Sequence, residues 1–270
     1  MTKPFLKWAG GKRQLLPEIL ALMPAGFDRY FEPFIGGGAL FFHTQPKQAF
    51  ISDVNEELIN CYQIVRDKPH ELISSLHQHR YEAEYYYDLR DIDRDGVAFA
   101  ALDDVERASR LIYLNRTGFN GMYRVNKKGH FNVPFGRYVN PKIVNEPLIL
   151  EASQALQDTH IRLAPYEESL SKAQSGDFVY LDPPYMPVSK TASFTSYAKD
   201  DFGFDKQEAL ADFCRFLDKK QVRFIASNAY LPPIIELYQG FQQKEIQARR
   251  AINSRADKRH SVSEILIWNF

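Results

Sequence analysis

Asp182, Pro183, Pro184 and Tyr185 are the four consecutive residues whose types and order best suit chemistry. They follow an apolar run at 178–181 that predicts a buried strand, and ligands of open parallel sheets bind beyond the carboxyl ends of the strands. The two prolines fix φ and favour an extended backbone before them, which holds the Asp182 carboxylate at a set separation from the Tyr185 ring. The alternative is a plain Pro-Pro turn with no role in catalysis.

An acceptor and a ring in this arrangement suit the exocyclic amine of adenine, a poor nucleophile whose lone pair is delocalised into the base. The Asp182 carboxylate and a carbonyl of the Pro-Pro segment would accept the two amine hydrogens and free the lone pair, while Tyr185 stacks on the base. Because a base inside a duplex is out of reach, it must be flipped into the pocket. Catalysis would then rest on positioning and electrostatics, without a metal. Residues 189–197, soon after Tyr185, are a candidate loop over the flipped base.

A glycine turn is the second candidate site. Phe34 and Gly36-Gly37-Gly38 lie between a predicted strand and a predicted helix, where glycine lets the backbone approach a ligand and the helix N-terminus offers unpaired N–H groups. Asp53 ends the next predicted strand, and a carboxylate at such a position accepts the hydroxyls of a ribose. A helix N-cap is the alternative for Asp53. A methyl donor for the adenine would therefore bind at the glycine turn.

These residues need a parallel sheet to bring them together, and the sequence predicts one. Apolar strands are expected around 29–32, 49–53, 161–164, 177–181, 222–228 and 264–270, and helices around 15–23, 38–42, 55–65 and 209–217. Residues from about 68 to 142 show no parallel-strand signal and pass from polar helix to glycine-rich loop. The sequence therefore predicts an α/β sheet domain made of 1–56 and 145–270, interrupted by a recognition domain at 57–144.

Composition excludes several classes of protein. The chain has 270 residues, 44% apolar and 25% charged, which is typical of a globular protein and not of a disordered, collagen-like or coiled-coil chain. No apolar run approaches the roughly 18 to 20 residues of a membrane helix, and the N-terminus shows no signal segment, so we expect a cytoplasmic protein. Cys61 and Cys214 lie far apart and are expected to be buried thiols rather than metal ligands.

The formal net charge of zero hides a strong segregation of charge. Residues 107–142 contain eight basic residues and no acidic one, interleaved with aromatic rings, whereas residues 82–106 contain nine acidic and two basic residues. A further basic run lies at 249–259. The central basic window is typical of a nucleic-acid surface, and a solvated face sorted by sign is the alternative.

Together these features resemble the α-group of DNA adenine-N6 methyltransferases, and within it the GATC-specific Dam type. The similarity covers essentially the whole chain, and it is also carried by Trp8-Ala-Gly-Gly-Lys12, Glu32-Pro-Phe34, Leu114-Asn-Arg116-x-Gly-Phe119-Asn120-Gly and Phe131-Asn-Val-Pro134-Phe-Gly-Arg137-Tyr. The segments GGKRQLLP, GGGALFF and FTSY are most similar to the GATC-modifying methylases of restriction-modification systems. The resemblance implies a Rossmann-like sheet that uses S-adenosylmethionine, with an inserted, small, mainly helical DNA-recognition domain.

The resemblance also implies individual roles. The residues that match the family's S-adenosylmethionine contacts are Trp8, Lys12, Asp53 and Asp182, although Trp8 and Lys12 alone are more typical of a core aromatic and a surface lysine. Lys7 matches a residue that reaches the outer guanine, and Arg124 one that reads the guanine opposite the last cytosine. Met122, where leucine is more frequent, would touch a thymine methyl together with Pro134. Phe119, where tyrosine is common in the family, would wedge into the base stack. The remaining matches, which would bind the DNA backbone or shape the recognition loop, are Arg116, Asn120 and Arg137.

Three other functions compete with this interpretation. A methyltransferase for an RNA base or a glutamine amide would use the same turn but usually carries Asn in place of Asp182. A dinucleotide dehydrogenase would leave Asp182 to Tyr185 unexplained, and a non-catalytic DNA-binding module would not need the cofactor residues. The expected partner is double-stranded DNA with GATC sites. Two roles stay open at this point: a stand-alone regulatory methylase, and the functional companion of a cognate restriction endonuclease that acts on the same site.

Overall fold

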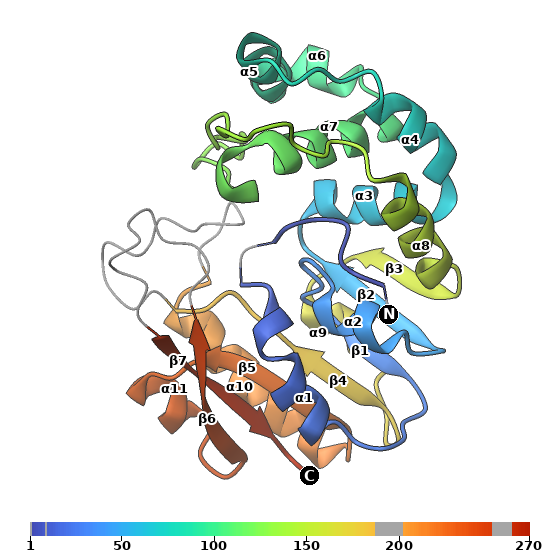
Figure 1. The fold of residues 1–270 in the computed structure, drawn as a ribbon. Coiled ribbons are helices and arrows are strands. Elements are labelled where there is room, and N and C mark those ends of the chain that lie inside the picture. Colours follow the sequence, from blue (N-terminus) through green and yellow to red (C-terminus); the bar gives the residue numbers. More distant parts are fainter. Residues whose placement is uncertain (1, 9, 187–201, 250–260) are drawn as a thin grey trace.

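The computed structural model describes residues 2–8, 10–186, 202–249 and 261–270. The candidate loop at 189–197 and nearly all of the basic run at 249–259 lie outside these residues. The strands of the described chain are β1 (Tyr30–Glu32), β2 (Ala49–Asp53), β3 (Thr159–Leu163), β4 (Phe178–Leu181), β5 (Arg223–Ala229), β6 (Gln242–Arg249) and β7 (Ser261–Trp268). They form one sheet in the order β3-β2-β1-β4-β5-β7-β6 (Figure 1).

Strands β1 to β5 are mutually parallel, and β7 runs antiparallel to both β5 and β6. The strand order makes β1 and β4 neighbours at the centre of the sheet, although they are far apart in sequence. After β1 the chain continues into a helix on one face of the sheet, and after β4 it continues into a helix on the other face. The boundary between β1 and β4 is therefore the topological switch point of the sheet. Ligands of open α/β sheets bind at such a point, beyond the carboxyl ends of the strands.

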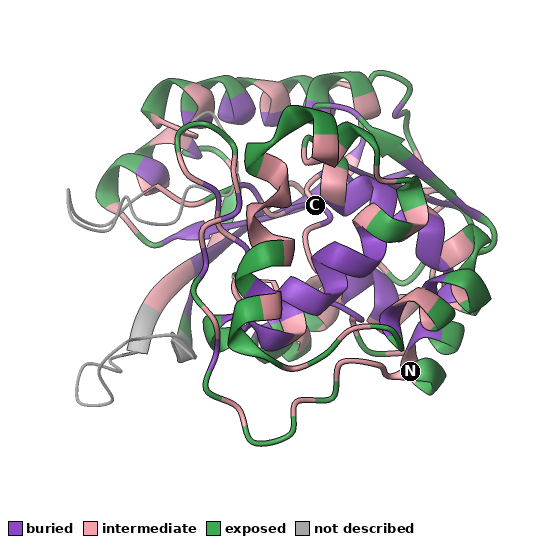
Figure 2. Cartoon of the chain, turned by 90° about the horizontal axis from the view of Figure 1, so that it is seen from above, coloured by how far each residue is buried: buried purple, intermediate pink, exposed green. Residues whose placement is uncertain are grey.

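Helices cover both faces of the sheet. They are α1 (Leu16–Leu22), α2 (Ala39–Thr44), α3 (Glu56–Asp67), α4 (Pro69–Leu76), α5 (Ala83–Asp91), α6 (Gly96–Ala100), α7 (Asp104–Thr117), α8 (Glu146–Leu156), α9 (Tyr166–Ser169), α10 (Phe204–Lys219) and α11 (Pro232–Leu237), with 3₁₀ turns η1 (Lys12–Gln14), η2 (Ile92–Arg94) and η3 (Phe119–Gly121). Because successive strand residues point to opposite faces, Phe178 and Tyr180 join the core under α2 and α3, and Val179 and Leu181 join the core under α10 and α11. Buried segments accordingly lie in the middle of the molecule (Figure 2).

The inserted helices α4 to α7 form a group beside the sheet (Figure 1). Helix α7 begins at a capping box, in which Asp103 and Glu106 each bind the other's backbone N–H. After α7 the chain makes two antiparallel bridges, Gly118 with Phe135 and Val125 with Phe131. Tyr86 and Tyr123 of the insert belong to the same core cluster as the sheet residues Tyr30 and Ile51, so a continuous apolar core joins the insert to the sheet.

The predicted α/β sheet is confirmed, including all six predicted strands. Sequence reasoning assigned no element to β6 or α8. Strand β6 is an edge strand of largely polar sequence that pairs with β7 alone, so it has no apolar run to reveal it. The thiols of Cys61 and Cys214 are both buried and unpaired, as expected.

Candidate active site

The glycine turn lies against Trp8 and Asp53. Gly36 has φ of 44°, in the left-handed region, and its N–H donates to Asp53 Oδ2 over 3.2 Å. A Cβ on Gly36 would lie 2.8 Å from the indole of Trp8, too close for any side chain. The Trp8 ring therefore packs directly on the turn, and glycine is required at position 36 both for its conformation and for this contact.

Asp53 is not the N-cap of α3. Asn55 caps that helix, since its side chain accepts from Leu58 N over 3.1 Å. The Asp53 carboxylate instead accepts from the backbone N–H groups of Gly36 and Asn55, the latter over 3.0 Å. Burial raises the pKa of Asp53 to about 6, and these backbone hydrogen bonds oppose the rise. The alternative N-cap role is thus wrong, and the carboxylate is held at the carboxyl end of β2 beside the glycine turn.

Lys12 and Asp182 form an ion pair in the interior. Lys12 is only 4% exposed, which makes the surface-lysine alternative wrong. Its Nζ lies 2.8 Å from Asp182 Oδ1 and donates to Gly10 O over 2.7 Å. Burial raises the pKa of Asp182, while the Lys12 ammonium and a hydrogen bond from Ser227 lower it. Asp182, at the end of β4, is thereby joined to the N-terminal segment and to β5.

Tyr185 lies in the same cluster. Lys12 Nζ is 4.5 Å from the centroid of the Tyr185 ring, a cation–π distance, and Tyr185 Oη donates to Glu264 Oε2 over 2.6 Å. The Pro184 carbonyl accepts from Gln207 Nε2 over 3.0 Å. Asp182, Pro184 and Tyr185 are therefore fixed by partners from four other elements, η1, β5, α10 and β7. The alternative of a plain Pro-Pro turn is not supported.

A buried polar layer supports the cluster from the sheet. Ser227 Oγ donates to Asp182 Oδ1 over 2.9 Å and lies 3.2 Å from the hydroxyl of Tyr180. Glu32, 2% exposed, accepts from the Tyr30 hydroxyl over 2.7 Å, and burial raises its pKa to about 8. Burial therefore favours the neutral form of Glu32 beside Asp182.

The N-terminal segment also contacts the insert. Asn115, 1% exposed, accepts from Lys7 N over 2.9 Å and donates to Lys7 O over 2.8 Å and to Gly121 O over 2.9 Å. The exposed Lys7 side chain has its Nζ 5.4 Å from the Tyr138 ring. Asn115 thereby fixes Lys7 next to the segment that contains the other predicted DNA-contacting residues.

Several predicted DNA-contacting residues gather in the segment after α7. Phe119 is 40% exposed and its N–H donates to the carbonyl of the exposed Pro134 over 2.8 Å. The adjacent Asn120 is exposed with φ of 56°. Met122 is half-buried against the core. Arg124 donates to the Asn132 side chain over 2.6 Å and to the Asn132 carbonyl over 3.1 Å, which orients its guanidinium.

Apart from Arg124, which Asn132 binds, the basic residues of the window at 107–142 divide into two groups. Arg107 pairs with Glu56 and Glu57, Arg110 pairs with Asp93 over 3.0 Å, and Arg116 donates to the Phe5 carbonyl over 2.6 Å, so these three residues stabilise the fold. The second group is exposed to solvent and consists of Lys127, Lys128, Arg137 and Lys142. The reading of the whole window as one nucleic-acid surface is therefore too broad, because its first three arginines neutralise or bind groups of the protein itself.

Sequence reasoning missed four contributors to the cluster and its surroundings: Glu264, Gln207, Asn115 and Tyr123. Each is a common polar or aromatic residue far in sequence from its partner. Asn115 lies within the segment Leu114-Asn-Arg116 that carries the family resemblance, but nothing local in the sequence indicates which group it, or any of the others, contacts. Phe34, which was predicted, packs on Tyr166 with the ring centroids 5.5 Å apart.

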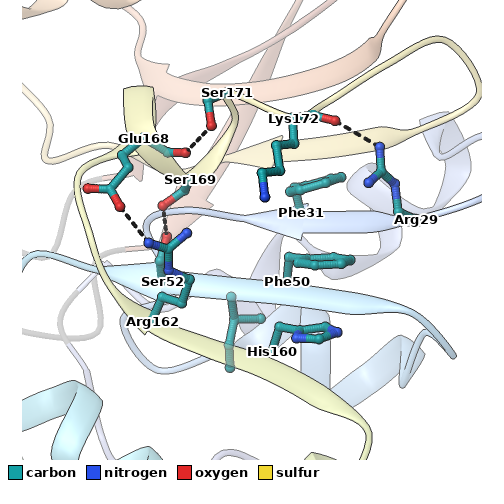
Figure 3. Close-up of a pocket in the computed structure, with 11 residues that line it drawn as sticks. Arg29, Phe31, Phe50, Ser52, His160, Arg162, Glu168, Ser169, Ser171 and Lys172 are labelled. Atoms are coloured by element: carbon teal, nitrogen blue, oxygen red, sulfur yellow. Dashed lines mark hydrogen bonds and ion pairs between the residues drawn. The ribbon is translucent and has the colours of Figure 1, made fainter.

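A cavity of about 280 Å³ lies elsewhere, over β1, β2 and β3 (Figure 3). Arg29 there pairs with Asp177 over 2.6 Å, and Arg162 pairs with Glu168 over 2.5 Å. None of the predicted site residues lines this cavity.

Within the described ranges, no three His, Cys, Asp or Glu side chains gather as a metal site would require. No helix in that part of the chain has the length and apolar character needed to cross a membrane.

Comparisons with known proteins agree with this geometry. Residues 8–252 match the family of D12 class N6 adenine-specific DNA methyltransferases. The type II methyltransferase M1.LlaDCHI of Lactococcus lactis subsp. cremoris is 47% identical over 99% of this chain and 95% of its own length. The type II methyltransferase M.MjaIII of Methanocaldococcus jannaschii is 42% identical over 100% of this chain and 99% of its own length. The DNA adenine methylase of Escherichia coli K12 is 35% identical over 98% of this chain and 94% of its own length.

These matches favour a DNA adenine methyltransferase over an RNA or glutamine methyltransferase, a dehydrogenase or a non-catalytic DNA-binding module. They extend over both the sheet and the insert, and the methyl donor used by such enzymes is generally S-adenosylmethionine. With its seven-stranded methyltransferase sheet and its Asp182 to Tyr185 cluster, this chain belongs to the D12 class of N6 adenine-specific DNA methyltransferases.

Proposed function

We propose that this enzyme methylates N6 of the adenine in GATC sites of duplex DNA and takes the methyl group from S-adenosylmethionine. The observation that carries the proposal is the buried contact of Lys12 with Asp182 and Tyr185 at the end of β4. It joins an acceptor for the adenine amine, a ring for the base and a cation within one cluster. The cluster lies at the switch point of the sheet, where ligands of this architecture bind.

The residues of the glycine turn fit the proposed cofactor. The turn has no side chain at Gly36, and Asp53 offers a carboxylate whose backbone donors leave acceptor capacity for the ribose hydroxyls. Lys12 and Asp182 carry the two charges that complement the carboxylate and the ammonium of an amino acid. When bound, S-adenosylmethionine supplies an electrophilic methyl group on a positively charged sulfur.

The chain's own residues would prepare the adenine. Both contacts of Asp182 with Lys12 and Ser227 use Oδ1, so we assign Oδ2 as the acceptor for one amine hydrogen. The Pro183 carbonyl is the candidate acceptor for the other. These two acceptors favour a pyramidal nitrogen with a localised lone pair, and the Tyr185 ring, together with Pro183 and Pro184, holds the flipped base in place.

We assign sequence reading to the insert at 57–144 together with Lys7. Arg124 is pre-oriented by Asn132 for a bidentate contact to guanine, and Pro134 and Met122 are apolar partners for a thymine methyl. The exposed ring of Phe119 is suited to wedge into the base stack. Asn120 and Arg137 are exposed and suited to bind phosphates, whereas Arg116 shapes the segment by holding the Phe5 carbonyl.

We further propose a cytoplasmic enzyme that protects GATC sites from a cognate restriction endonuclease. The two type II methyltransferases from Lactococcus lactis and Methanocaldococcus jannaschii that are similar to this chain support the assignment. The DNA adenine methylase of Escherichia coli K12 supports the same reaction.

The test is a labelled methyl-transfer assay with duplexes that differ by single base pairs. We expect transfer to a GATC duplex and a strong decrease when any one of the four pairs is changed. A duplex RNA of the same sequence serves as the control for the RNA alternative. Equal transfer to altered and unaltered duplexes would contradict GATC specificity, and transfer to cytosine would contradict the assigned chemistry.

A further inference from the structure

Strand β7 brings an acidic residue to the site from the far end of the chain. It runs antiparallel between β5 and β6, so its first half lies beside the carboxyl end of β5. Glu264 is paired in register with Ala229 on one side and with Ile246 on the other. Because β7 runs opposite to β5, Glu264 lies at the edge of the sheet where the parallel strands end.

Glu264 contacts two members of the cluster. Its Oε2 accepts the Tyr185 hydroxyl over 2.6 Å and lies 4.0 Å from Lys12 Nζ. Its side chain is only 17% exposed. A hydrogen bond to an ionised, largely buried carboxylate is shorter and stronger than one between neutral groups. The 2.6 Å distance from the Tyr185 hydroxyl and the Lys12 ammonium 4.0 Å away fit a charge-assisted hydrogen bond to Glu264.

The bond fixes the orientation of the ring. The backbone end of Tyr185 is held by Pro183 and Pro184, whose carbonyl at 184 is bound by Gln207. The side chain then has two rotatable bonds, and a hydrogen bond at its far end selects one combination of them. Burial and the nearby carboxylates of Asp182 and Glu264 raise the pKa of Tyr185 far above its usual value. The hydroxyl accordingly stays protonated and remains a donor.

We propose that Glu264 is a positioning residue, which holds the Tyr185 ring in the orientation that stacks on the target adenine. The inference rests on the proposed role of Tyr185 in binding a flipped base. Glu264 acts through Tyr185 and not on the reacting atoms. A purely structural role, such as fastening β7 to the sheet, would change thermal stability without any special dependence on the Tyr185 hydroxyl.

The experiment compares the kinetics of the wild type with those of four variants. These are Glu264→Ala, Glu264→Gln, Tyr185→Phe and the double variant Glu264→Ala/Tyr185→Phe. Glu245→Ala is the matched control, because Glu245 is an exposed carboxylate on β6 paired with Ile265, the neighbour of Glu264. The measurements are kcat and KM for a GATC duplex, cofactor affinity by calorimetry, the thermal midpoint, and fluorescence of a duplex with 2-aminopurine in place of the target adenine.

We expect Glu264→Ala and Tyr185→Phe each to lower kcat about tenfold, as the loss of one charge-assisted hydrogen bond would. Duplex KM and cofactor affinity should change less than about twofold. The double variant should also lose about tenfold, because both changes remove the same bond. Glu264→Gln should recover most activity, since its amide oxygen still accepts. The 2-aminopurine signal should be brighter in Glu264→Ala and Tyr185→Phe, because a poorly oriented ring quenches less.

Three results would overturn the inference. A double variant weakened about a hundredfold would show that the two residues act independently. A normal kcat for Glu264→Ala would show that Glu264 does not position Tyr185 for catalysis. If Glu264→Ala lost as much cofactor affinity as kcat, Glu264 would instead act on cofactor binding through Lys12. A wild-type enzyme that methylates no duplex would instead refute the proposed function, so the two failures are distinguishable.

Discussion

The indole of Trp8 stacks on the ring of Tyr123, with the centroids 4.9 Å apart and the planes inclined by 20°. Tyr123 stands between Met122 and Arg124 in the segment assigned to DNA reading, and it is 7% exposed. Trp8 also packs against the glycine turn at Gly36. The Trp8 side chain thus contacts both Tyr123 of the proposed DNA-reading segment and Gly36 of the proposed cofactor turn.

This contact predicts that a residue of the DNA-reading segment affects cofactor binding. Tyr123→Leu keeps an apolar side chain but removes the stacked ring, so S-adenosylmethionine affinity should fall by about 1 kcal/mol, a typical value for an aromatic pair. Tyr123→Phe keeps the ring and should bind as the wild type does. Calorimetric titration without DNA measures both, and an unchanged affinity in Tyr123→Leu would show that Trp8 needs no support from the insert.

Asp53 predicts a pH dependence of cofactor binding. Its pKa is raised from 3.8 to about 6, so the carboxyl group is protonated below that pH and loses its strength as an acceptor. Cofactor affinity should therefore fall as the pH drops through about 6. Asp53→Asn should weaken binding at pH 8 by about 1.5 to 3 kcal/mol and should show no such decline at low pH. The same slope in both proteins would place the titration elsewhere.

The raised pKa of Asp53 also has a consequence for stability. The folded state holds the Asp53 proton more tightly than the unfolded state does, so this group's contribution to the free energy of unfolding decreases as the pH rises from about 4 to about 6. Asp53→Asn should flatten that part of the stability curve. Denaturant titrations of both proteins across this range provide the check.

Asp182 is predicted to be essential for turnover and not for DNA binding. Asp182→Ala removes the acceptor for the adenine amine and leaves Lys12 without its partner at 2.8 Å, so kcat should fall at least about a hundredfold. Binding of a GATC duplex should stay close to that of the wild type. Full activity in Asp182→Ala would refute the assigned role, and a lost duplex affinity would indicate a mainly structural one.

Arg124 and Arg137 are predicted to act differently on DNA. Arg124 is held by Asn132 toward a defined direction, and loss of a bidentate guanine contact costs about 1 to 3 kcal/mol. Arg124→Ala should therefore weaken GATC binding and relax the preference at one guanine. Arg137 is exposed, and a phosphate contact carries no sequence information. Arg137→Ala should weaken all duplexes alike and reduce the salt slope by about one unit.

The two arginine variants serve as controls for each other. Affinities for single-substituted sites, measured at two salt concentrations, separate a base contact from a phosphate contact. A uniform loss in Arg124→Ala with a relaxed position in Arg137→Ala would mean that the roles are reversed. No effect in either variant would mean that this part of the basic window is a solvated face.

Much of this architecture is readable from sequence because its signals are local. Buried parallel strands such as β4 appear as short apolar runs, and the glycine turn with Asp53 and the residues from Asp182 to Tyr185 stand at strand ends, where ligands bind. Charge counting was less informative. Arg107 and Arg110 lie in an acid-free stretch, yet their partners Glu57 and Asp93 come from elsewhere in the chain.

The support of the site was not predictable from local pattern. Glu264 reaches Tyr185 only because β7 runs antiparallel beside β5, and Asn115 holds Lys7 across most of the insert. Both are long-range hydrogen bonds between ordinary polar residues, which leave no spacing signature in the sequence. Such partners become visible only when the chain is folded.

Methyl transfer to adenine N6 within GATC is measured by the extent of labelled methyl incorporation at completion. Three duplexes of one sequence are needed: unmethylated, N6-methylated on one strand, and N6-methylated on both strands of the GATC site. We expect one methyl group per unmodified GATC strand, hence incorporation into the first two duplexes and none into the third, with all label recovered as N6-methyladenine. Label entering the fully methylated duplex, or recovered on any other base, would contradict it.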